Sequence, residues 1–462
     1  TCASCPVGMV CPAGSDDQSN LPFIDQGYWS AAEDPFEIYL CNEAAHCTGG
    51  APNSCAPSRD VHSIACGLCE NGAYEDGHGE CQACGGSAAI LVLLLFVAGS
   101  MVTTIFLHFA VNRNILQQRL SMITCVSVLG LTIAAMQTLG VMSSLSLNMI
   151  SPLKEIVSSI SVLSLNINVV QTDCFFGSGA VTKFFWRQCV LPGFILLVCA
   201  VVLVNWFRGK KTYFIRELTN TCGTIVNVFF ISVLLTAITP FICYSHPGES
   251  GVSVRAFPSV LTHKPEFGAM VLISVAALGC IILPFISLVS YATLMYPRFV
   301  ADPRRHHNLQ QCRFLFYRFR PATYYYGLVV MVRSALLCFV PVVVRDDAAA
   351  QVLLMSLILQ VALVIQTLTR PWKHKMTNVF DGFLTSGLQL ILVCASLNVE
   401  TATDRMLFWL GALCSLFVLG NIVVGLSYAI YLRLHPSPFF NYFICHHKAG
   451  GAAQARLLKK ML

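Results

Sequence analysis

Two ionisable residues lie in segments of the chain that are otherwise apolar. Arg333 lies roughly 14 Å into one such segment if the segment is helical, and Asp381 lies near the start of another. Charged side chains are costly inside a membrane and are therefore functional candidates there. We expect Arg333 and Asp381 to form a charge pair, and its functional interpretation is a pair beside a water-filled path or gate. The alternative is a structural ion pair that orients two helices.

Uncharged polar side chains form a second group of candidates within the apolar segments. They are Asn220, Thr224, Asn227, Gln351, Gln360 and Gln366. The first three recur at spacings of four and three residues, which places them on one face of a helix. Two explanations are consistent with this face: it lines a hydrated cavity, or it forms hydrogen bonds between helices, which is the one we favour. Pro284, deep in another apolar segment, is expected to kink its helix, either as a hinge or only as a packing feature.

Cysteine is the third residue type that points to a specific chemistry. Ten of the 22 cysteines precede residue 85, and they are Cys2, Cys5, Cys11, Cys41, Cys47, Cys55, Cys66, Cys69, Cys81 and Cys84. This polar segment is too poor in apolar residues to build its own core, so we expect about five disulfides and an extracellular or lumenal setting. Zinc binding at the C-x-x-C pairs is the alternative, which the acidic surroundings disfavour. Cys174 and Cys243 border predicted outer loops, and we expect them to pair with each other.

Composition identifies the elements that must position these residues. The chain has 462 residues, of which 55% are hydrophobic and 11% are charged, and this balance is typical of a polytopic membrane protein. Nine apolar runs are long enough to cross the roughly 30 Å of a bilayer's hydrocarbon core. They cover residues 88–110, 120–142, 190–207, 221–242, 267–296, 324–344, 348–368, 379–397 and 406–432. Three charged residues, 345–347, separate the sixth run from the seventh.

These runs predict an all-α polytopic fold of about nine transmembrane helices with a small disulfide-rich extracellular domain. The expected divisions are a cysteine-rich region at residues 1–85, a transmembrane domain at 86–432 and a basic cytosolic tail at 433–462. Most Lys and Arg residues fall in loops on the side of the tail, and most Asp and Glu residues fall on the other side. The positive-inside rule then places the N-terminus outside and the C-terminus in the cytosol. Because the chain begins at Thr1, we expect more ectodomain before it.

Basic residues on the inner side predict contacts with anionic inner-leaflet lipids, in addition to the surrounding membrane lipid. They gather at residues 298–320 and 448–460, where each close charge adds roughly 1 kcal/mol of attraction. The alternative is that they only set topology. An apolar pattern over 149–163 predicts an amphipathic helix at the outer surface. We expect no enzyme activity, cofactor, metal site or nucleic-acid partner, because no phosphate-binding loop, zinc-hydrolase motif or nucleophile elbow occurs.

Several motifs resemble those of a known family. The segments CASCPVGMVCPAG and CGLCENGAYEDGHGECQACGG are similar to ephrin-receptor-like cysteine-rich repeats of protist and algal surface proteins. The segments LSLNINVVQTDC, FLFYRFRPATYYYGLVVMVRSALL and TRPWKHKMTNVFDGFLTSGLQL, with ILPF around Pro284, resemble the transient-receptor-potential-like multi-span domain that follows such repeats. The resemblance implies a channel-like protein of the plasma membrane, including ciliary or flagellar membrane. The chain departs from the family pattern at Gly327 and Ser334, where charged residues are usual.

Two classes of function are consistent with this sequence. The first is a cation channel or channel-like sensor whose ectodomain receives a mechanical or ligand signal. The second is a non-conducting anchor or adhesion protein, in which the cysteine-rich repeats hold an extracellular fibre, wall or protein partner. An oligomer is compatible with either class. A continuous polar path through the bundle favours the first, and a dry, lipid-sealed bundle favours the second.

Overall fold

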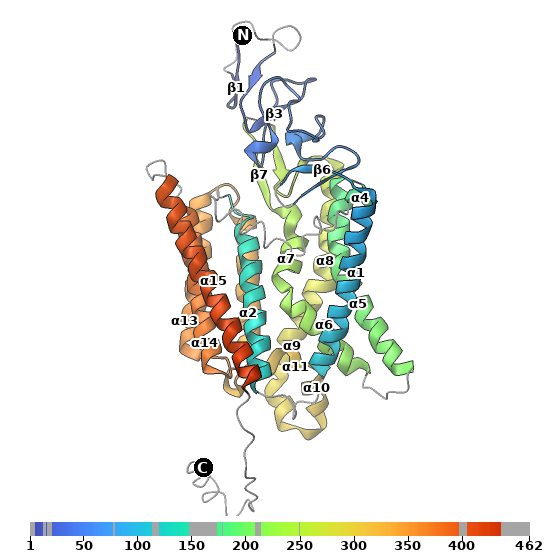
Figure 1. The fold of residues 1–462 in the computed structure, drawn as a ribbon, viewed down its shortest axis with the longest axis vertical. Coiled ribbons are helices and arrows are strands. Elements are labelled where there is room, and N and C mark those ends of the chain that lie inside the picture. Colours follow the sequence, from blue (N-terminus) through green and yellow to red (C-terminus); the bar gives the residue numbers. More distant parts are fainter. Residues whose placement is uncertain are drawn as a thin grey trace, which may run out of the picture.

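The structure is a computed structural model of the chain, and Figure 1 shows its ribbon. It describes residues 5–12, 15, 21–76, 79–112, 120–146, 173–177, 179–207, 214–248, 250–396 and 404–435. Cys2, the expected amphipathic helix at 149–163 and the basic residues at 448–460 lie outside these described residues.

Long apolar helices form most of the described chain. They are α1 (Gly86–Asn112), α2 (Leu120–Met142), α5 (Ala180–Phe207), α6 (Phe214–Val228), α7 (Phe230–Ile238), α8 (Pro265–Ala277), α9 (Leu283–Ala301), α12 (Tyr326–Val343), α13 (Ala348–Thr369), α14 (Lys375–Ser396) and α15 (Asp404–Leu434). Shorter helical pieces are α4 (Asp173–Phe176), α10 (His306–Gln311), α11 (Arg313–Phe316) and the turns η1 (Ala44–His46), η2 (Ile64–Cys66), η6 (Thr239–Phe241), η7 (Leu278–Ile282), η8 (Pro303–Arg305) and η9 (Pro321–Thr323).

The prediction of about nine spans is confirmed. Within the described ranges, 8 helical segments are long and apolar enough to cross a membrane, and α6 with α7 to Phe241 makes a ninth if this bent pair is one span. The charged turn at 345–347 separates α12 from α13 as expected. Asp347 caps α13 there, because its side chain accepts the backbone N–H of Ala350 at 3.0 Å.

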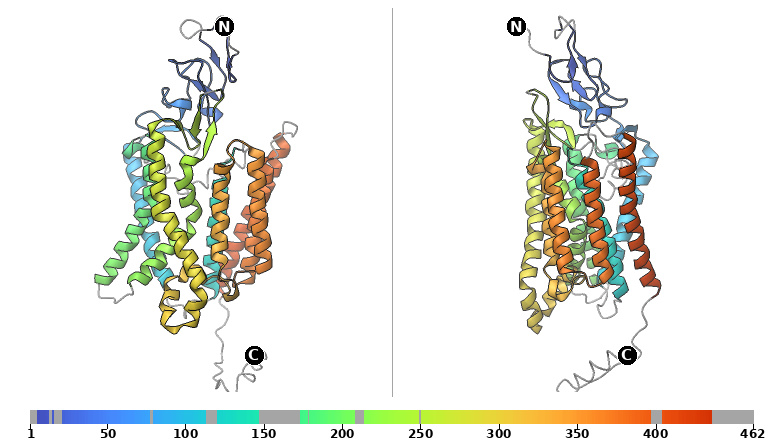
Figure 2. Two further views of the ribbon diagram at one scale, coloured as in Figure 1. Left: turned by 180° about the vertical axis from the view of Figure 1, so that it is seen from behind. Right: turned by 90° about the vertical axis from the view of Figure 1, so that its left-hand side faces the viewer.

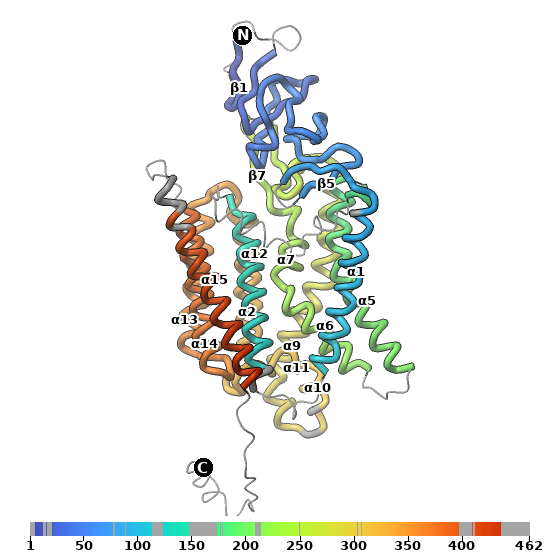
Figure 3. Tube along the Cα trace, in the orientation of Figure 1, coloured from blue at the N-terminus to red at the C-terminus, as the bar shows by residue number. Residues whose placement is uncertain are grey.

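Two groups of helices lie side by side in the bundle (Figures 1 and 2). One group contains α2, α13, α14 and α15, and the other contains α1, α5, α6, α8 and α9. α7 and α12 contact each other, and both contact α2, so these three helices form the seam between the groups (Figure 3). We call the end of the bundle that carries the N-terminal region the outer end. α15 ends at the opposite, inner end, as an odd number of spans requires.

Two helices of the bundle are interrupted, for different reasons. Pro284 lies in the first turn of α9, directly after the π-helical turn η7, which joins α8 to α9 as one long span. A π turn is a common accommodation where the regular hydrogen-bond ladder is broken. The sharper bend, 66°, lies at Phe229 between α6 and α7, where the chain has no proline. This second break was not predicted from the sequence.

The described part of the cysteine-rich region contains antiparallel pairs of short strands, each two or three residues long. Its strands are β1 (Met9–Val10), β2 (Phe23–Ile24), β3 (Tyr28–Ser30), β4 (Ile38–Leu40), β5 (Ala73–Glu75) and β6 (Cys81–Ala83), paired as β1–β2, β3–β4 and β5–β6. Its disulfides join Cys5 to Cys11, Cys41 to Cys47, Cys55 to Cys66 and Cys69 to Cys81. The cysteines of the described C-x-x-C pairs therefore bond to other partners, which supports the disulfide interpretation over zinc and suggests an extracellular or lumenal location.

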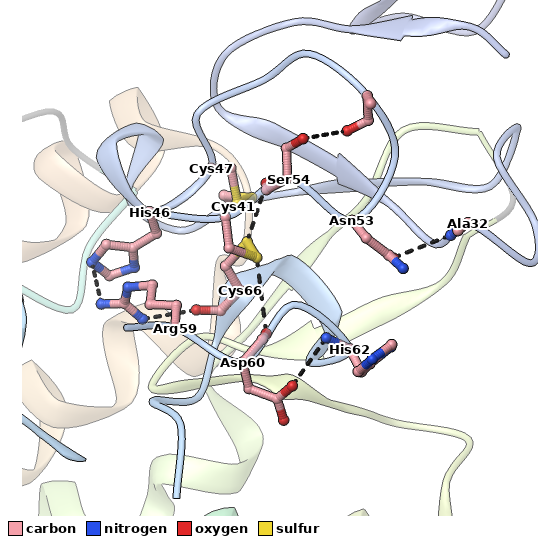
Figure 4. The surroundings of a disulfide bond; sticks show 12 residues. Ala32, Cys41, His46, Cys47, Asn53, Ser54, Arg59, Asp60, His62 and Cys66 are labelled. Atoms are coloured by element: carbon pink, nitrogen blue, oxygen red, sulfur yellow. Dashed lines mark hydrogen bonds between the residues drawn. A yellow bond between two sulfur atoms is a disulfide. The ribbon is translucent and has the colours of Figure 1, made fainter. Parts of the chain in front are cut away.

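Arg59 lies at the centre of a polar network in the cysteine-rich region. It is buried, and it donates to the backbone oxygens of Cys66 at 2.7 Å and Gly79 at 2.5 Å. It also forms an ion pair with Glu75 at 3.0 Å and contacts His46 at 2.8 Å. Figure 4 shows Arg59 between His46 and Cys66, beside the disulfides. A buried charge is tolerated when it is paired and hydrogen-bonded in this way.

The expected Cys174–Cys243 disulfide is wrong. Cys174 bonds to Cys84, the last cysteine of the cysteine-rich region, and Cys243 is a free thiol, 4% exposed. The physical reason is position: Cys84 directly precedes α1 and Cys174 lies in α4 directly before α5, so both lie at the outer ends of neighbouring helices. Cys243 begins a β-strand, and its thiol lies 3.3 Å from the backbone oxygen of Pro240.

Candidate functional site

Arg333 lies midway along α12, in the part of the bundle where α12 contacts α7 and α2. Its side chain is half-buried, and its Nε atom is shielded from solvent without a hydrogen-bond partner. In the described part of the chain, the Arg333 guanidinium forms no ion pair. An arginine carries five N–H donors, so this side chain has unused capacity to bind an acceptor.

Arg318 reaches the same region from the loop between α11 and η9. Residues 318–320 lie beside residues 371–373, with Phe319 and Trp372 in an antiparallel bridge. The rings of these two residues lie 4.8 Å apart. Burial lowers the pKa of the Arg318 guanidinium to about 10, because the charged form loses hydration. Its Nε atom is also buried without a partner.

Both arginines line a cavity of about 50 Å³ at the seam. We call it the seam cavity and define it by Gly130, Gln137, Asn227, Arg318, Arg333 and Trp372. A Cβ atom added at Gly130 would lie 3.7 Å from the Arg318 Nη1 atom, so the guanidinium group extends to α2. The volume is enough for a few water molecules or one small ion.

Asp381 does not pair directly with Arg333, contrary to the simplest form of the expectation. Its Oδ2 atom accepts the indole N–H of Trp372 at 2.8 Å, and the residue is 3% exposed. Arg333 is close enough to attract the carboxylate electrostatically, although the two groups form no ion pair. Trp372 therefore stands between the acid and the seam cavity, and the arginines are left without a carboxylate partner in it.

The six predicted polar residues do not line a common path. Only Asn227 among them lines the seam cavity. The Asn220 side-chain oxygen accepts the backbone N–H of Phe314 at 3.1 Å, and the Thr224 hydroxyl donates to the Asn220 backbone oxygen at 2.7 Å. Asn220 therefore forms a hydrogen bond between helices, and Thr224 forms one within its own helix.

The glutamines of α13 lie at three different levels. Gln351 is buried near the outer end, where its amide N–H groups donate to the backbone oxygens of Val344 and Arg345, each at 2.7 Å. Gln360 is exposed on the helix and accepts from the Gln389 amide at 3.0 Å. Gln366 lies near the inner end and donates to the Asn378 backbone oxygen at 2.6 Å. These bonds tie α13 to its neighbours and to the turn before it.

Two residues of the seam cavity were missed by sequence reasoning. Gln137 is one polar residue in an otherwise apolar run, and nothing in its spacing distinguishes it from a lipid-facing or interhelical glutamine. Arg318 belongs to a basic loop that was explained by topology and lipid contact alone. The position of Arg318 between aromatic residues could have predicted its burial. A loop that packs its aromatic side chains inward also buries the arginine between them.

A second candidate site is the contact between the cysteine-rich region and the bundle. The chain leaves α7 through η6 and forms a three-stranded antiparallel sheet of β7 (Cys243–Ser245), β8 (Val252–Val254) and β9 (Phe257–Leu261) before entering α8. We call it the outer sheet. The Tyr244 hydroxyl donates to the Leu40 backbone oxygen at 3.0 Å, and the Leu40 N–H donates to His246 Nδ1, also at 3.0 Å.

Apolar packing extends this contact. Leu261 of the outer sheet is buried in one hydrophobic cluster with Trp29 and Tyr39 of the cysteine-rich region. A Cβ atom added at Gly67 would lie 2.9 Å from the backbone nitrogen of Ser259, which shows how closely the two backbones approach. The cysteine-rich region is therefore held on the bundle by side-chain hydrogen bonds to the Leu40 backbone, apolar burial and the Cys84–Cys174 disulfide.

The outer sheet also reaches the other helix group. The Ser245 hydroxyl donates to Asp346 Oδ2 at 2.9 Å, in the turn between α12 and α13. Arg255 donates to the Ser146 hydroxyl at 2.8 Å, just beyond α2. One small sheet thus contacts the cysteine-rich region and both sides of the seam. The sequence of the 243–264 loop did not predict this sheet, because its strands are three to five residues long.

Burial controls the chemistry of His246. Its Nδ1 atom accepts from Leu40, so the neutral ring carries its proton on Nε2, which donates to the Ser253 hydroxyl at 2.8 Å. Burial lowers the pKa of His246 to about 4, and the rings of Tyr39 and Tyr244 pack against it at 5.1 and 4.9 Å. The imidazole is therefore neutral at ordinary pH.

No family model, no curated protein and no solved structure matches this chain. Within the described residues, no group of three or more His, Cys, Asp or Glu side chains is arranged to hold a metal ion. What the fold and the site show is a multi-span membrane protein with an N-terminal disulfide-rich region, and no family is identified for it.

Proposed function

We propose that the protein is a cell-surface sensor that transmits load or ligand binding from its cysteine-rich region to the helical bundle. The observation that carries the proposal is the direct path from Leu40 through Tyr244 to α7. Tyr244 of β7 and His246 directly after it hold Leu40 by hydrogen bonds, and only η6 and Ile242 separate this strand from α7, the outer half of the broken span. A displacement of the cysteine-rich region would thus act on the broken span.

The position of α7 supports this role. The helix contacts α2, α12, α5 and α8, and so it lies against both helix groups. A span bent by 66° in its middle can change its bend without unfolding either half, which is how hinges absorb domain motions. The second attachment, Cys84–Cys174, connects to α1 and α5 and fixes the cysteine-rich region against simple detachment.

Transmission is a better-supported function than cation conduction. The transient-receptor-potential-like resemblance implies a channel, but the seam cavity is small and is lined by Arg318 and Arg333. A positively charged site opposes cations. We therefore place the sensor function first, in the plasma membrane, with lipids and an extracellular protein partner as its surroundings.

The test is hydrogen exchange of the full chain in lipid nanodiscs, read on the segment from Phe230 to Phe241. Tyr244→Phe removes the donor to Leu40 and leaves the ring in place. We expect this variant to exchange faster both in β4 and in the outer turn of α7. Tyr325→Phe, an exposed tyrosine at the inner end, is the matched control and should leave both segments unchanged.

The opposite result has a clear meaning. If β4 loosens in Tyr244→Phe while η6 and α7 keep the wild-type exchange, the cysteine-rich region does not communicate with the bundle. The second candidate function, a non-conducting anchor for an extracellular fibre or partner, would then replace the sensor. It is favoured by the dense disulfides and the buried Arg59 network, which make the cysteine-rich region resistant to extension.

A further inference from the structure

The seam cavity gathers groups that donate hydrogen bonds and carry positive charge. Arg318 and Arg333 enter it from different elements, and the Nε atom of each is buried without a partner. Leaving a buried donor unsatisfied costs roughly 1–3 kcal/mol, and more when the group is charged. Two such groups in one cavity indicate that a bound acceptor completes the structure.

Gln137 gives an independent indication from a third element. It is 1% exposed, it lines the same cavity from α2, and neither its Nε2 nor its Oε1 atom has a hydrogen-bond partner. A fully buried amide with both ends free is rare in folded proteins. Its N–H₂ group can donate to the same acceptor that the arginines face.

The charges around the cavity leave one positive charge in excess. Among the described residues, Arg318 and Arg333 contribute two, and Asp381, whose carboxylate interacts electrostatically with Arg333 and accepts from Trp372, offsets one. α2, α6 and α7 contribute only uncharged lining residues. One monovalent anion would therefore balance the site, and the volume of about 50 Å³ fits an ion of that size.

The backbone favours an anion at this place as well. Phe230 and Ile231, the first residues of α7, line the cavity. The amino end of a helix carries unsatisfied N–H groups and a partial positive charge, and it attracts anions. Half-helices that begin inside a membrane are used in this way at substrate and ion sites.

We propose that the seam cavity binds one small monovalent inorganic anion of the halide class, held by Arg318, Arg333 and Gln137. The anion joins α2, α12 and the loop before η9 at the level where α6 gives way to α7. Its binding strengthens the contact between the two helix groups. The site does not depend on the sensor function, because its lining residues are not those that hold the cysteine-rich region on the outer sheet.

The test compares thermal unfolding of the purified full chain in sodium bromide and in sodium gluconate at equal concentration. Gluconate is too large for the cavity. We expect bromide to raise the Tm of the wild-type protein by about 3 °C over gluconate, since a ligand that binds only the folded state stabilises it. Arg318→Gln and Gln137→Leu should each abolish this difference. An equal wild-type Tm in both salts would overturn the proposal.

Matched controls separate the site from general salt effects. Arg320→Gln changes an arginine in the same loop, and Gln360→Leu changes a glutamine on a helix surface, and neither residue lines the cavity. Both controls should keep the bromide-dependent difference. If Arg318→Gln and Gln137→Leu also keep it, the anion acts elsewhere and the inference is wrong.

A direct measurement covers the case in which a cavity variant fails to fold. Crystals of the wild-type chain grown in bromide should show an anomalous scattering peak between Arg318, Arg333 and Gln137. Ordered water alone at that position, with no anomalous signal at saturating bromide, would contradict the proposal. The measurement needs no variant and no assay of function.

Discussion

His246 makes the contact between the cysteine-rich region and the bundle sensitive to a single proton. In the folded chain its Nδ1 atom accepts from Leu40, and a protonated ring would turn this acceptor into a donor facing another donor. The rings of Tyr39 and Tyr244 pack against the imidazole, which is 6% exposed. Protonation and this contact are therefore mutually exclusive.

The sign of the pH effect follows from the pKa. An unfolded histidine binds a proton near pH 6.5, whereas His246 in the folded chain binds one only near pH 4. Stability from this residue is complete above pH 6.5 and is lost as the pH falls from 6.5 to 4, by at most about 3 kcal/mol. We expect His246→Asn to show a flatter decline of Tm between pH 7 and pH 4.5 than wild type.

The control for this measurement is His62→Asn, an exposed histidine of the same region, which should keep the wild-type decline. A His246→Asn profile as steep as that of the wild-type chain would mean that other groups cause the pH dependence. Asn is chosen because its side-chain oxygen can still accept from the Leu40 N–H, so that the substitution removes the proton site and keeps the acceptor.

At the scale of single residues, the sequence predicted which spans carry the charged residues, but it did not predict which residues these charges contact. Arg333 and Asp381 lie in the spans where hydropathy placed them. Their partners depend on how the loops at 318–320 and 371–373 fold back, which brings Trp372 to Asp381 and Arg318 to Arg333. A helical spacing of three or four residues does not predict which distant loops pack together.

At the scale of elements, a glycine explains how α6 and α11 can pack so closely. A Cβ atom at Gly223 would lie 2.5 Å from the ring of Phe314. We expect Gly223→Ala to destabilise the chain by about 1–3 kcal/mol, because an ordered core must shift to accept the extra methyl group. The measurement is Tm in detergent or nanodiscs.

Gly268 in α8 is the matched comparison. Nothing lies within 4 Å of a Cβ atom added there, and the backbone is helical. Gly268→Ala should leave stability unchanged or raise it by up to about 1 kcal/mol, since alanine is the better helix former. Equal effects of the two substitutions would show that α11 does not pack against α6 as described.

The Cys84–Cys174 disulfide is the covalent element that fixes the cysteine-rich region to the bundle. It closes a loop with a sequence separation of 90 residues. We expect Cys84→Ser with Cys174→Ser to lower stability by about 2–4 kcal/mol, the usual worth of a native disulfide. The contact of Leu40 with Tyr244 should then open more often, which limited proteolysis between the cysteine-rich region and α1 would detect.

Peptide mapping of the unreduced protein tests the pairing itself. A Cys84 peptide linked to a Cys174 peptide is expected, with Cys243 available to a thiol reagent after unfolding. A Cys174–Cys243 linkage would restore the pairing that the sequence had suggested. That expectation rested on both residues lying outside the membrane, and it could not include the distance between loop ends, which only the packing of α1 beside α5 sets.

Composition predicted the helices themselves, but it did not predict features that depend on how they pack. Hydropathy predicted the spans because each must bury roughly 20 apolar residues in lipid. It did not predict the bend at Phe229 or the outer sheet, because short strands and a break without proline leave no compositional trace. Both features arise from contacts that α7 and β7 make with residues far away in the sequence.

On the scale of the whole molecule, the cysteine-rich region stands over one helix group, and α13 to α15 carry none of it (Figures 1 and 2). Force applied to the cysteine-rich region would reach α1, α5, α7 and α8 first. The force would reach the other group through the seam and through the Ser245–Asp346 hydrogen bond. A relative movement of the two groups is the response that the proposed sensor function requires.

Measuring ion flux through liposomes that contain the purified chain tests whether a movement of the two helix groups opens a path for cations. The seam cavity carries the charge of Arg318 and Arg333, and a positive site repels cations electrostatically. We expect neither the wild-type chain nor Arg333→Ala to pass cations under voltage alone. Cation flux in wild type that Arg333→Ala changes would establish a path through the seam and would replace the sensor by a channel. Flux appearing only in Arg333→Ala would show that the seam is a path which this arginine closes, because removing one positive charge then lowers the barrier to cations.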